Sequence, residues 1–363
     1  MQIYLTLIMH ILTKYDIVVY RNNIYNLVRY VMVKIQPDYY ENFRCLMGDC
    51  PSSCCEMWQI VIDEKSLDYY NNLDTEYGKH IQSEIECCDG EYCFKVHNGR
   101  CAFLNDNDLC DIHCNIGQEH MANTCRKFPD FTVENKDSLI TGQSMSCPYV
   151  ARQIVAHSGT VDFISTGKCS NTYENTLLGI MTELIGIAYE NPSPILEKAR
   201  ILLKEACKKQ VELFEKFDVE EFFIPEDNKT ISDYCDTLNS LTFLTEEWKE
   251  TVDSLSNFEY NHEDEKDFLK YLGTRQQEYE QILVYFIYRY FLTGAGDGNI
   301  FLPIKFSVIC LRIIYMTGLL AYKNKGSFSV EEQIRLCYTF SKEIEHSEEN
   351  MEIFLEDISL GMI

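Results

Sequence analysis

Four cysteine side chains crowd into one short stretch of the chain, and they are the residues best suited to chemistry. They fall within eleven consecutive positions and are Cys45, Cys50, Cys54 and Cys55. Thiolates this close together are poor disulfide partners for one another, but they can converge on one zinc ion or iron–sulfur cluster. The residues between them include Gly48, Pro51 and Ser52, which favour turns, so we expect a loop that curls its sulfur atoms inward.

More cysteines follow at intervals that fit the same metal site. They are Cys101, Cys110, Cys125 and Cys147. Eight thiols can fill one four-ligand site with four to spare, or two four-ligand sites, and the spacing does not decide between these. The total of 17 cysteines is odd, neighbours such as Cys87 and Cys88 are adjacent, and no secretory signal is recognisable. These features are typical of a reducing compartment, so we expect a cytoplasmic protein whose cysteines are thiols or ligands.

The cysteines belong to a series of short motifs between residues 39 and 152. The series opens with F-x-C-x(2)-G-x-C-x(3)-C-C-x(2)-W and continues with C-x-F-L, L-C-x-I-H, T-C-x-x-F-P and S-C-P. In content and order it resembles the flagellin lysine N-methylase family, and it is similar to the cysteine series of iron- or zinc-chelating domains. The resemblance implies an iron–sulfur cluster of the 4Fe–4S type, with zinc as the alternative. The implied ligands are Cys45, Cys50, Cys54, Cys55, Cys101, Cys110, Cys125 and Cys147.

The same resemblance implies a reaction. A member of this family would transfer a methyl group from S-adenosylmethionine to lysine ε-amines of flagellin, or of another lysine-bearing protein. The amine must be neutral to attack the methyl carbon, so some group or water must accept its proton. The alternative from another class is a non-catalytic metal-binding protein that uses its helical half as an interaction surface.

The sequence assigns neither a catalytic residue nor a cofactor-binding residue. The one glycine-rich candidate for a nucleotide-type loop, at residues 294–298, follows a predicted helix, whereas a Rossmann-type loop follows a strand. A helix end and loop are therefore expected there. Tyr39, Tyr40 and Trp58 flank the first cysteines, and we expect them to pack.

The chain is strongly acidic, with a formal net charge of −25 over 363 residues. Binding to nucleic acid draws its affinity from clustered lysine and arginine, so a nucleic-acid partner is not expected. An acidic surface instead favours encounters with basic groups such as exposed lysines.

The pattern of the chain predicts an α+β protein that is mainly α-helical. We expect an N-terminal extension at residues 1–36, a cysteine-rich domain with small hairpins at 37–157, and a helical domain at 158–363. Translation is expected to start at Met32, with a membrane-touching segment at 1–31 as the alternative. The apolar runs 282–292 and 300–320 contain basic residues and predict buried helices, not membrane spans.

Local signals place the smaller elements. Asp63 is placed to cap a helix whose apolar spacing runs to Ile85, and Asn98-Gly99 predicts a tight hairpin. A second hairpin is expected over residues 131–141. Further predicted segments are helices at 174–190 and 195–217, a loop at 218–231, and a solvated acidic helical surface that includes Glu343, Glu345, Glu348, Glu349, Glu352, Glu356 and Asp357.

Overall fold

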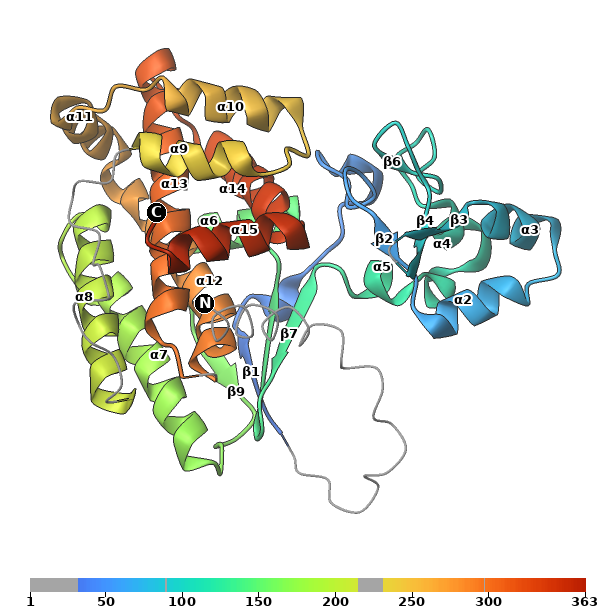
Figure 1. Cartoon of the computed structure of the whole chain (residues 1–363), viewed down its shortest axis with the longest axis horizontal. Coiled ribbons are helices and arrows are strands. Elements are labelled where there is room, and N and C mark those ends of the chain that lie inside the picture. The colour runs from blue at the N-terminus through green and yellow to red at the C-terminus, as the bar shows by residue number, and fades with distance from the viewer. Residues whose placement is uncertain (1–31, 89, 215–230, 297) are drawn as a thin grey trace.

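The computed structural model describes residues 32–88, 90–214, 231–296 and 298–363. The predicted late start and N-terminal segment, and almost all of the predicted loop at 218–231, lie outside the described residues. Figure 1 shows a large helical body joined to a smaller unit.

Helices make up most of the larger body, which confirms the prediction of a mainly helical α+β fold. They are α6 (Pro148–Val155), α7 (Thr172–Glu190), α8 (Ile195–Phe214), α9 (Ile231–Ser240), α10 (Glu246–Ser256), α11 (His262–Leu272), α12 (Gln276–Ala295), α13 (Phe301–Lys325), α14 (Val330–Glu345) and α15 (Glu348–Ser359).

The two apolar runs form α12 and α13, and both are buried at the centre of the body, as predicted. Helix α13 is the one described helix long and apolar enough to cross a membrane, yet 89% of its most apolar window is buried inside the protein. A buried core helix can be as long and as apolar as a membrane-spanning helix. The glycine-rich stretch after residue 293 ends α12 and connects it to α13, as expected.

A four-stranded sheet with the order β7-β8-β1-β9 packs on α12. Its strands are β1 (Val33–Pro37), β7 (Asp130–Glu134), β8 (Ser138–Gln143) and β9 (Phe163–Ser165). Strands β7 and β8 form the second predicted hairpin, while β1 pairs with β8 in parallel, with Val33 opposite Ser138. The hydroxyl of Tyr288 on α12 donates toward the sheet, at 2.8 Å from the Ile35 carbonyl and 2.9 Å from that of Thr141.

The smaller unit has its own core, with Ile60, Tyr70, Ile81, Phe94 and Phe103 buried in it. Its elements are β2 (Ile60–Val61), α2 (Glu64–Asn71), α3 (Glu76–Ser83), β3 (Ile85–Cys88), β4 (Glu91–Phe94), β5 (Val96–His97), β6 (Arg100–Cys101), α4 (Asp111–Ile116) and α5 (Asn123–Lys127). Strands β2, β4 and β3 form one sheet, and β5 and β6 form a two-stranded ribbon.

Two local predictions are confirmed in this unit, and one is wrong. The Asp63 carboxylate caps α2 by accepting from the Ser66 amide, and Asn98 and Gly99 have the positive φ angles of a primed turn between β5 and β6. The single helix expected to reach Ile85 is instead two helices followed by a strand. It breaks because the hydroxyl of Thr75 accepts from the Gly78 amide and starts a new helix.

The helical body takes residues from both sides of the segment that forms the core of the smaller unit. The core of the smaller unit draws on residues 60–125, in the middle of the predicted 37–157 segment. Val33, Ile35, Ile140 and Cys147 pack instead with the helical body. The loop that carries Cys50, Cys54 and Cys55 therefore lies in the connection between the two cores.

Candidate functional site

The first cysteine loop follows the turn-forming residues seen in the sequence. Between β1 and β2 the chain forms only two short 3-10 turns, Tyr40–Asn42 and Met47–Asp49. Met47 and Met57, which lie on either side of Cys50, Cys54 and Cys55, have positive φ angles of 55° and 73°. All 17 cysteines of the chain lie in the described part, and each is a free thiol.

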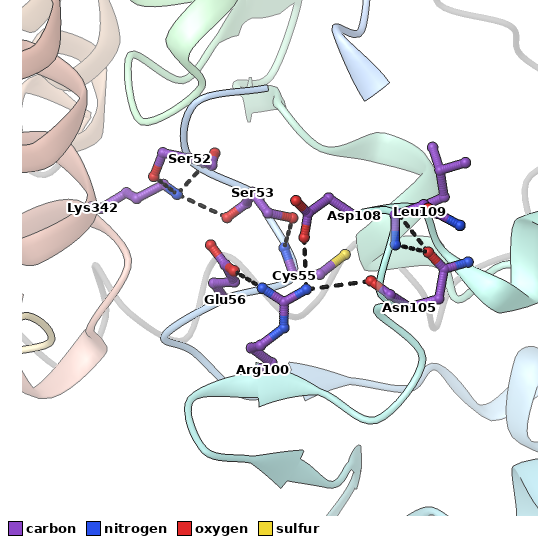
Figure 2. A network of polar contacts seen from close by, with 10 residues as sticks. Ser52, Ser53, Cys55, Glu56, Arg100, Asn105, Asp108, Leu109 and Lys342 are labelled. Atoms are coloured by element: carbon purple, nitrogen blue, oxygen red, sulfur yellow. Dashed lines mark hydrogen bonds and ion pairs between the residues drawn. The ribbon is translucent and has the colours of Figure 1, made fainter. Parts of the chain in front are cut away.

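The cysteine loop is held from the helical side by Lys342 of α14 (Figure 2). The Lys342 ammonium donates to the Ser52 hydroxyl at 2.7 Å, to the Ser53 carbonyl at 2.9 Å and to the Ser52 carbonyl at 3.2 Å. The Ser53 hydroxyl in turn accepts from the Cys55 amide at 3.1 Å. Burial lowers the pKa of Lys342, whereas the negative charge of the nearby thiolates raises that pKa.

The same loop is held from the other side by Arg100 of the β5–β6 hairpin (Figure 2). Its guanidinium lies 2.6 Å from the carboxylates of both Glu56 and Asp108 and also donates to the Asn105 carbonyl at 3.4 Å. The Met57 amide donates to the Gly99 carbonyl at 2.8 Å. The loop is thus fixed between a helix of the body and a hairpin of the smaller unit.

Most of the eight cysteines named from the sequence influence the pKa of a neighbouring thiol. The Cys54 and Cys55 side chains hydrogen-bond to each other, and this contact, followed by burial, raises the pKa of Cys54. Burial also raises the pKa of five others, and the charge of Cys54 raises each further: Cys50, Cys101, Cys110, Cys125 and Cys147. Cys45 acts on the pKa of Cys50 in the same way. Six of the other seven cysteines therefore interact electrostatically with Cys54, whereas Cys45 acts on Cys50.

The chemistry of these side chains suits an iron–sulfur cluster or zinc, because thiolates are the ligands that both prefer. Their arrangement does not form a coordination sphere. Among the residues that the structure describes, no group of three or more His, Cys, Asp or Glu side chains is placed to hold a metal ion. The eight-cysteine ligand set stays a prediction from the sequence.

A cavity of about 370 Å³ lies next to this loop, between the two units. Trp58 and Thr124 line it from the smaller unit, and residues of α12, α13, α15 and the end of α14 line it from the body. The Trp58 indole donates to the Cys54 carbonyl at 2.6 Å, and its ring lies 4.8 Å from that of His346. A much smaller pocket on the Cys54 side shares Trp58 and His346 with the cavity, so these two rings separate the cavity from the thiols.

The cavity contains a buried ion pair. The Arg289 guanidinium of α12 lies 3.0 Å from the carboxylate of Glu345, whose side chain is fully buried. Tyr285 links the two: its hydroxyl accepts from Arg289 at 2.7 Å and from the Met145 amide at 3.0 Å, and it donates to Glu345 at 2.8 Å. Burial raises the pKa of Glu345, and the positive charge of Arg289 opposes that shift. Every hydrogen-bonding position of this hydroxyl is therefore used.

His346 is the second polar group in the cavity wall. Burial, followed by the positive charges of Arg289 and Lys342, lowers its pKa to about 3, so the imidazole is neutral at pH 7. One ring nitrogen hydrogen-bonds to the Ser146 hydroxyl. A neutral imidazole can accept or donate a single hydrogen bond in this position, and it adds no charge to the cavity.

The sequence did not predict that Trp58, Glu345 and the other lining residues form one cavity. It placed Glu343 and Glu345 on a solvated acidic surface, and that prediction is wrong because α14 turns both carboxylates inward. Glu343 accepts from the Leu244 amide at 2.8 Å and from the Thr245 hydroxyl at 2.6 Å. One feature of the sequence could have indicated this burial. Arg289 is a charged residue inside an apolar run, and a buried charge of this kind is usually paired with a buried carboxylate.

The chain matches one known protein family and several known proteins. Residues 189–360 match the family described as the FliB lysine N-methylase C-terminal domain. The chain is 25% identical over 127 residues to a lysine-N-methylase of Salmonella choleraesuis (strain SC-B67), a match covering 33% of this chain and 32% of that protein. It is 24% identical over 127 residues to the flagellar biosynthetic protein FliU of Salmonella muenchen, covering 33% of this chain and 75% of that protein.

Further matches, to homologs of a ribosome biogenesis protein, are of another kind. Over 101 residues the chain is 26% identical to the 60S ribosome subunit biogenesis protein NIP7 homolog of Danio rerio, which covers 28% of this chain and 56% of that protein. No solved structure matches the chain.

Proposed function

Because the chain is related to the flagellin lysine N-methylase family, we propose that it is an enzyme that transfers a methyl group from S-adenosylmethionine to lysine ε-amines of flagellin. The matched relatives carry the names lysine-N-methylase and flagellar biosynthetic protein. The match to the first covers about a third of that protein's length, so its activity is transferred here as a proposal.

The observation that carries the proposal is the cavity beside the cysteine loop. Arg289, Glu345 and His346 all lie within the segment that matches the methylase family, and Trp58 closes the first cysteine motif. The two parts of the sequence that suggest the family thus meet at one cavity. Its volume of about 370 Å³ lies in the range that small-molecule sites occupy.

The chemistry needs a neutral amine. The lone pair of the lysine nitrogen forms the new N–C bond while the S–CH₃ bond of the donor breaks, which leaves S-adenosylhomocysteine and a methylated lysine. S-adenosylmethionine supplies the activated methyl group. The chain would favour the neutral amine because the largely apolar wall of the cavity disfavours an ammonium, so the proton leaves to water before attack.

The proposal includes a metal centre at the cysteine loop. A 4Fe–4S cluster is the first candidate and zinc the alternative. The candidate ligands are Cys45, Cys50, Cys54, Cys55, Cys101, Cys110, Cys125 and Cys147. The hydrogen bonds of Lys342 and Arg100 would hold the loop ready for such a centre. Its role would be to fix the wall of the cavity that Trp58 forms.

The net charge of −25 suits a substrate that presents lysines, such as flagellin or another lysine-bearing protein, and a cytoplasmic location fits the free thiols. The same charge does not favour a function on RNA-rich ribosomal particles, although one relative is a ribosome biogenesis protein. The methylase proposal therefore stands first.

Mass spectrometry of flagellin tests the proposal. Flagellin from a strain that lacks this protein should lose lysine methylation, and re-expression of the protein should restore it. If methylation persists unchanged and no other basic protein loses methyl groups, a non-catalytic metal-binding role replaces the enzyme.

A further inference from the structure

The cavity between Trp58 and helices α12, α13 and α15 has walls of distinctive chemistry. Three aromatic side chains line it, from both units: Trp58, Tyr290 and Phe306. Tyr290 and Phe306 lie in edge-to-face contact, with ring centroids 4.7 Å apart, and Trp58 lies on the side of the smaller unit. Aromatic faces placed on two sides of a cavity suit a flat heteroaromatic ring.

The charges in the cavity sum to one negative charge. Arg289 contributes one positive charge against the carboxylates of Glu345 and Glu348, and His346 is neutral at pH 7. The pair formed by Arg289 and Glu345 lies deep, while Glu348 stands exposed in the first turn of α15. A ligand with an aromatic base and a net positive charge would therefore be favoured.

S-adenosylmethionine has this combination of features. It carries an adenine ring, a sulfonium and an ammonium against one carboxylate, and so has a net charge of +1. A lysine side chain is also cationic, but it has no aromatic ring and fills much less than about 370 Å³.

We propose that this cavity is the S-adenosylmethionine site, with Trp58, Tyr290 and Phe306 around the adenosyl group and Glu348 supplying negative charge at its edge. This assignment rests on the proposed methylase function. It places the methyl donor beside the cysteine loop, with the rings of Trp58 and His346 between the donor and Cys54.

Two variants test the site by direct binding. In Thr293→Phe, a larger side chain on α12 fills the cavity, so binding of S-adenosylmethionine should be lost. In Glu348→Gln, the affinity should fall about fivefold, the effect of removing one exposed charge contact. Glu349→Gln is the matched control, because Glu349 is exposed in the same turn of α15 and does not line the cavity.

Isothermal titration calorimetry of the full-length, metal-loaded protein provides the measurement, with S-adenosylmethionine and S-adenosylhomocysteine as the two probes. The second lacks the sulfonium charge, so Glu348→Gln should weaken it less than the first. Thermal melting of each variant checks that it is folded.

The outcomes separate this assignment from the proposed function. If folded Thr293→Phe and Glu348→Gln bind S-adenosylmethionine as tightly as the Glu349→Gln control, the donor lies elsewhere and the site assignment is wrong, while the methylase proposal stands. If the unaltered protein binds neither probe, the methylase proposal itself fails.

Discussion

Removing the Lys342 ammonium should loosen the cysteine loop without unfolding the protein. In Lys342→Met, a side chain of similar length keeps the packing of α14, but the three hydrogen bonds to Ser52 and Ser53 are lost. Hydrogen bonds from a charged donor contribute about 1.5–3 kcal/mol each, so the gross loss is above roughly 4 kcal/mol. The buried ammonium also costs several kcal/mol to desolvate, and that cost disappears with it.

We expect a net loss of about 2 kcal/mol in the free energy that keeps the loop closed, which corresponds to about 30-fold more frequent opening. Hydrogen–deuterium exchange measures it at two amides that the closed loop protects. The Cys55 amide donates to the Ser53 hydroxyl and the Met57 amide to the Gly99 carbonyl, so both should exchange faster.

Arg335→Met provides the matched control, because Arg335 lies two turns earlier on α14 and pairs with an exposed carboxylate, that of Glu247. Its effect on loop exchange should be negligible. Equal exchange rates in Lys342→Met and Arg335→Met would refute the argument that Lys342 closes the loop.

Three further changes test the site. His346 has a pKa of about 3 in the folded protein and near 6.5 in the unfolded chain, so the unfolded chain takes up a proton first and the free energy of unfolding falls as pH drops below about 6.5. Between pH 7 and pH 5, urea unfolding should show a loss of stability that is about 2 kcal/mol larger in the unaltered protein than in His346→Gln. Equal losses in the two proteins would contradict this. Tyr285→Phe leaves Glu345 and its arginine partner short of a buried hydrogen bond, so urea unfolding should show a loss of about 1–3 kcal/mol, whereas unchanged stability would mean that water replaces the hydroxyl. Changing Cys54 and Cys55 to Ser should empty the proposed metal site, which elemental analysis of anaerobically purified protein would show, and full iron or zinc content in that variant would exclude both as ligands.

Short-range signals in the sequence predicted much of the fold. The Asp63 cap, the Asn98-Gly99 turn and the buried helices α12 and α13 depend on neighbouring residues, and each is confirmed. The break at Thr75 was missed because the apolar spacing continues through it.

Long-range packing explains what the sequence could not predict. The parallel pairing of β1 with β8 joins residues more than 100 positions apart, so it leaves no local pattern. The same holds for the cavity: Glu345 is the last residue of α14, an acidic, amphipathic helix whose composition suggests exposure to solvent, and the position of α14 beside Arg289 buries its carboxylate. The cysteine motifs predicted the loop but not the cavity next to it.

The most direct test of the methylase account is a reaction with purified components. The anaerobically purified protein is incubated with flagellin of its own organism and S-adenosylmethionine that carries an isotopically labelled methyl group. The account predicts that the label appears on lysine side chains of flagellin peptides, and that Thr293→Phe abolishes it. Protein that binds its metal and the methyl donor but leaves every flagellin lysine unlabelled would contradict the account.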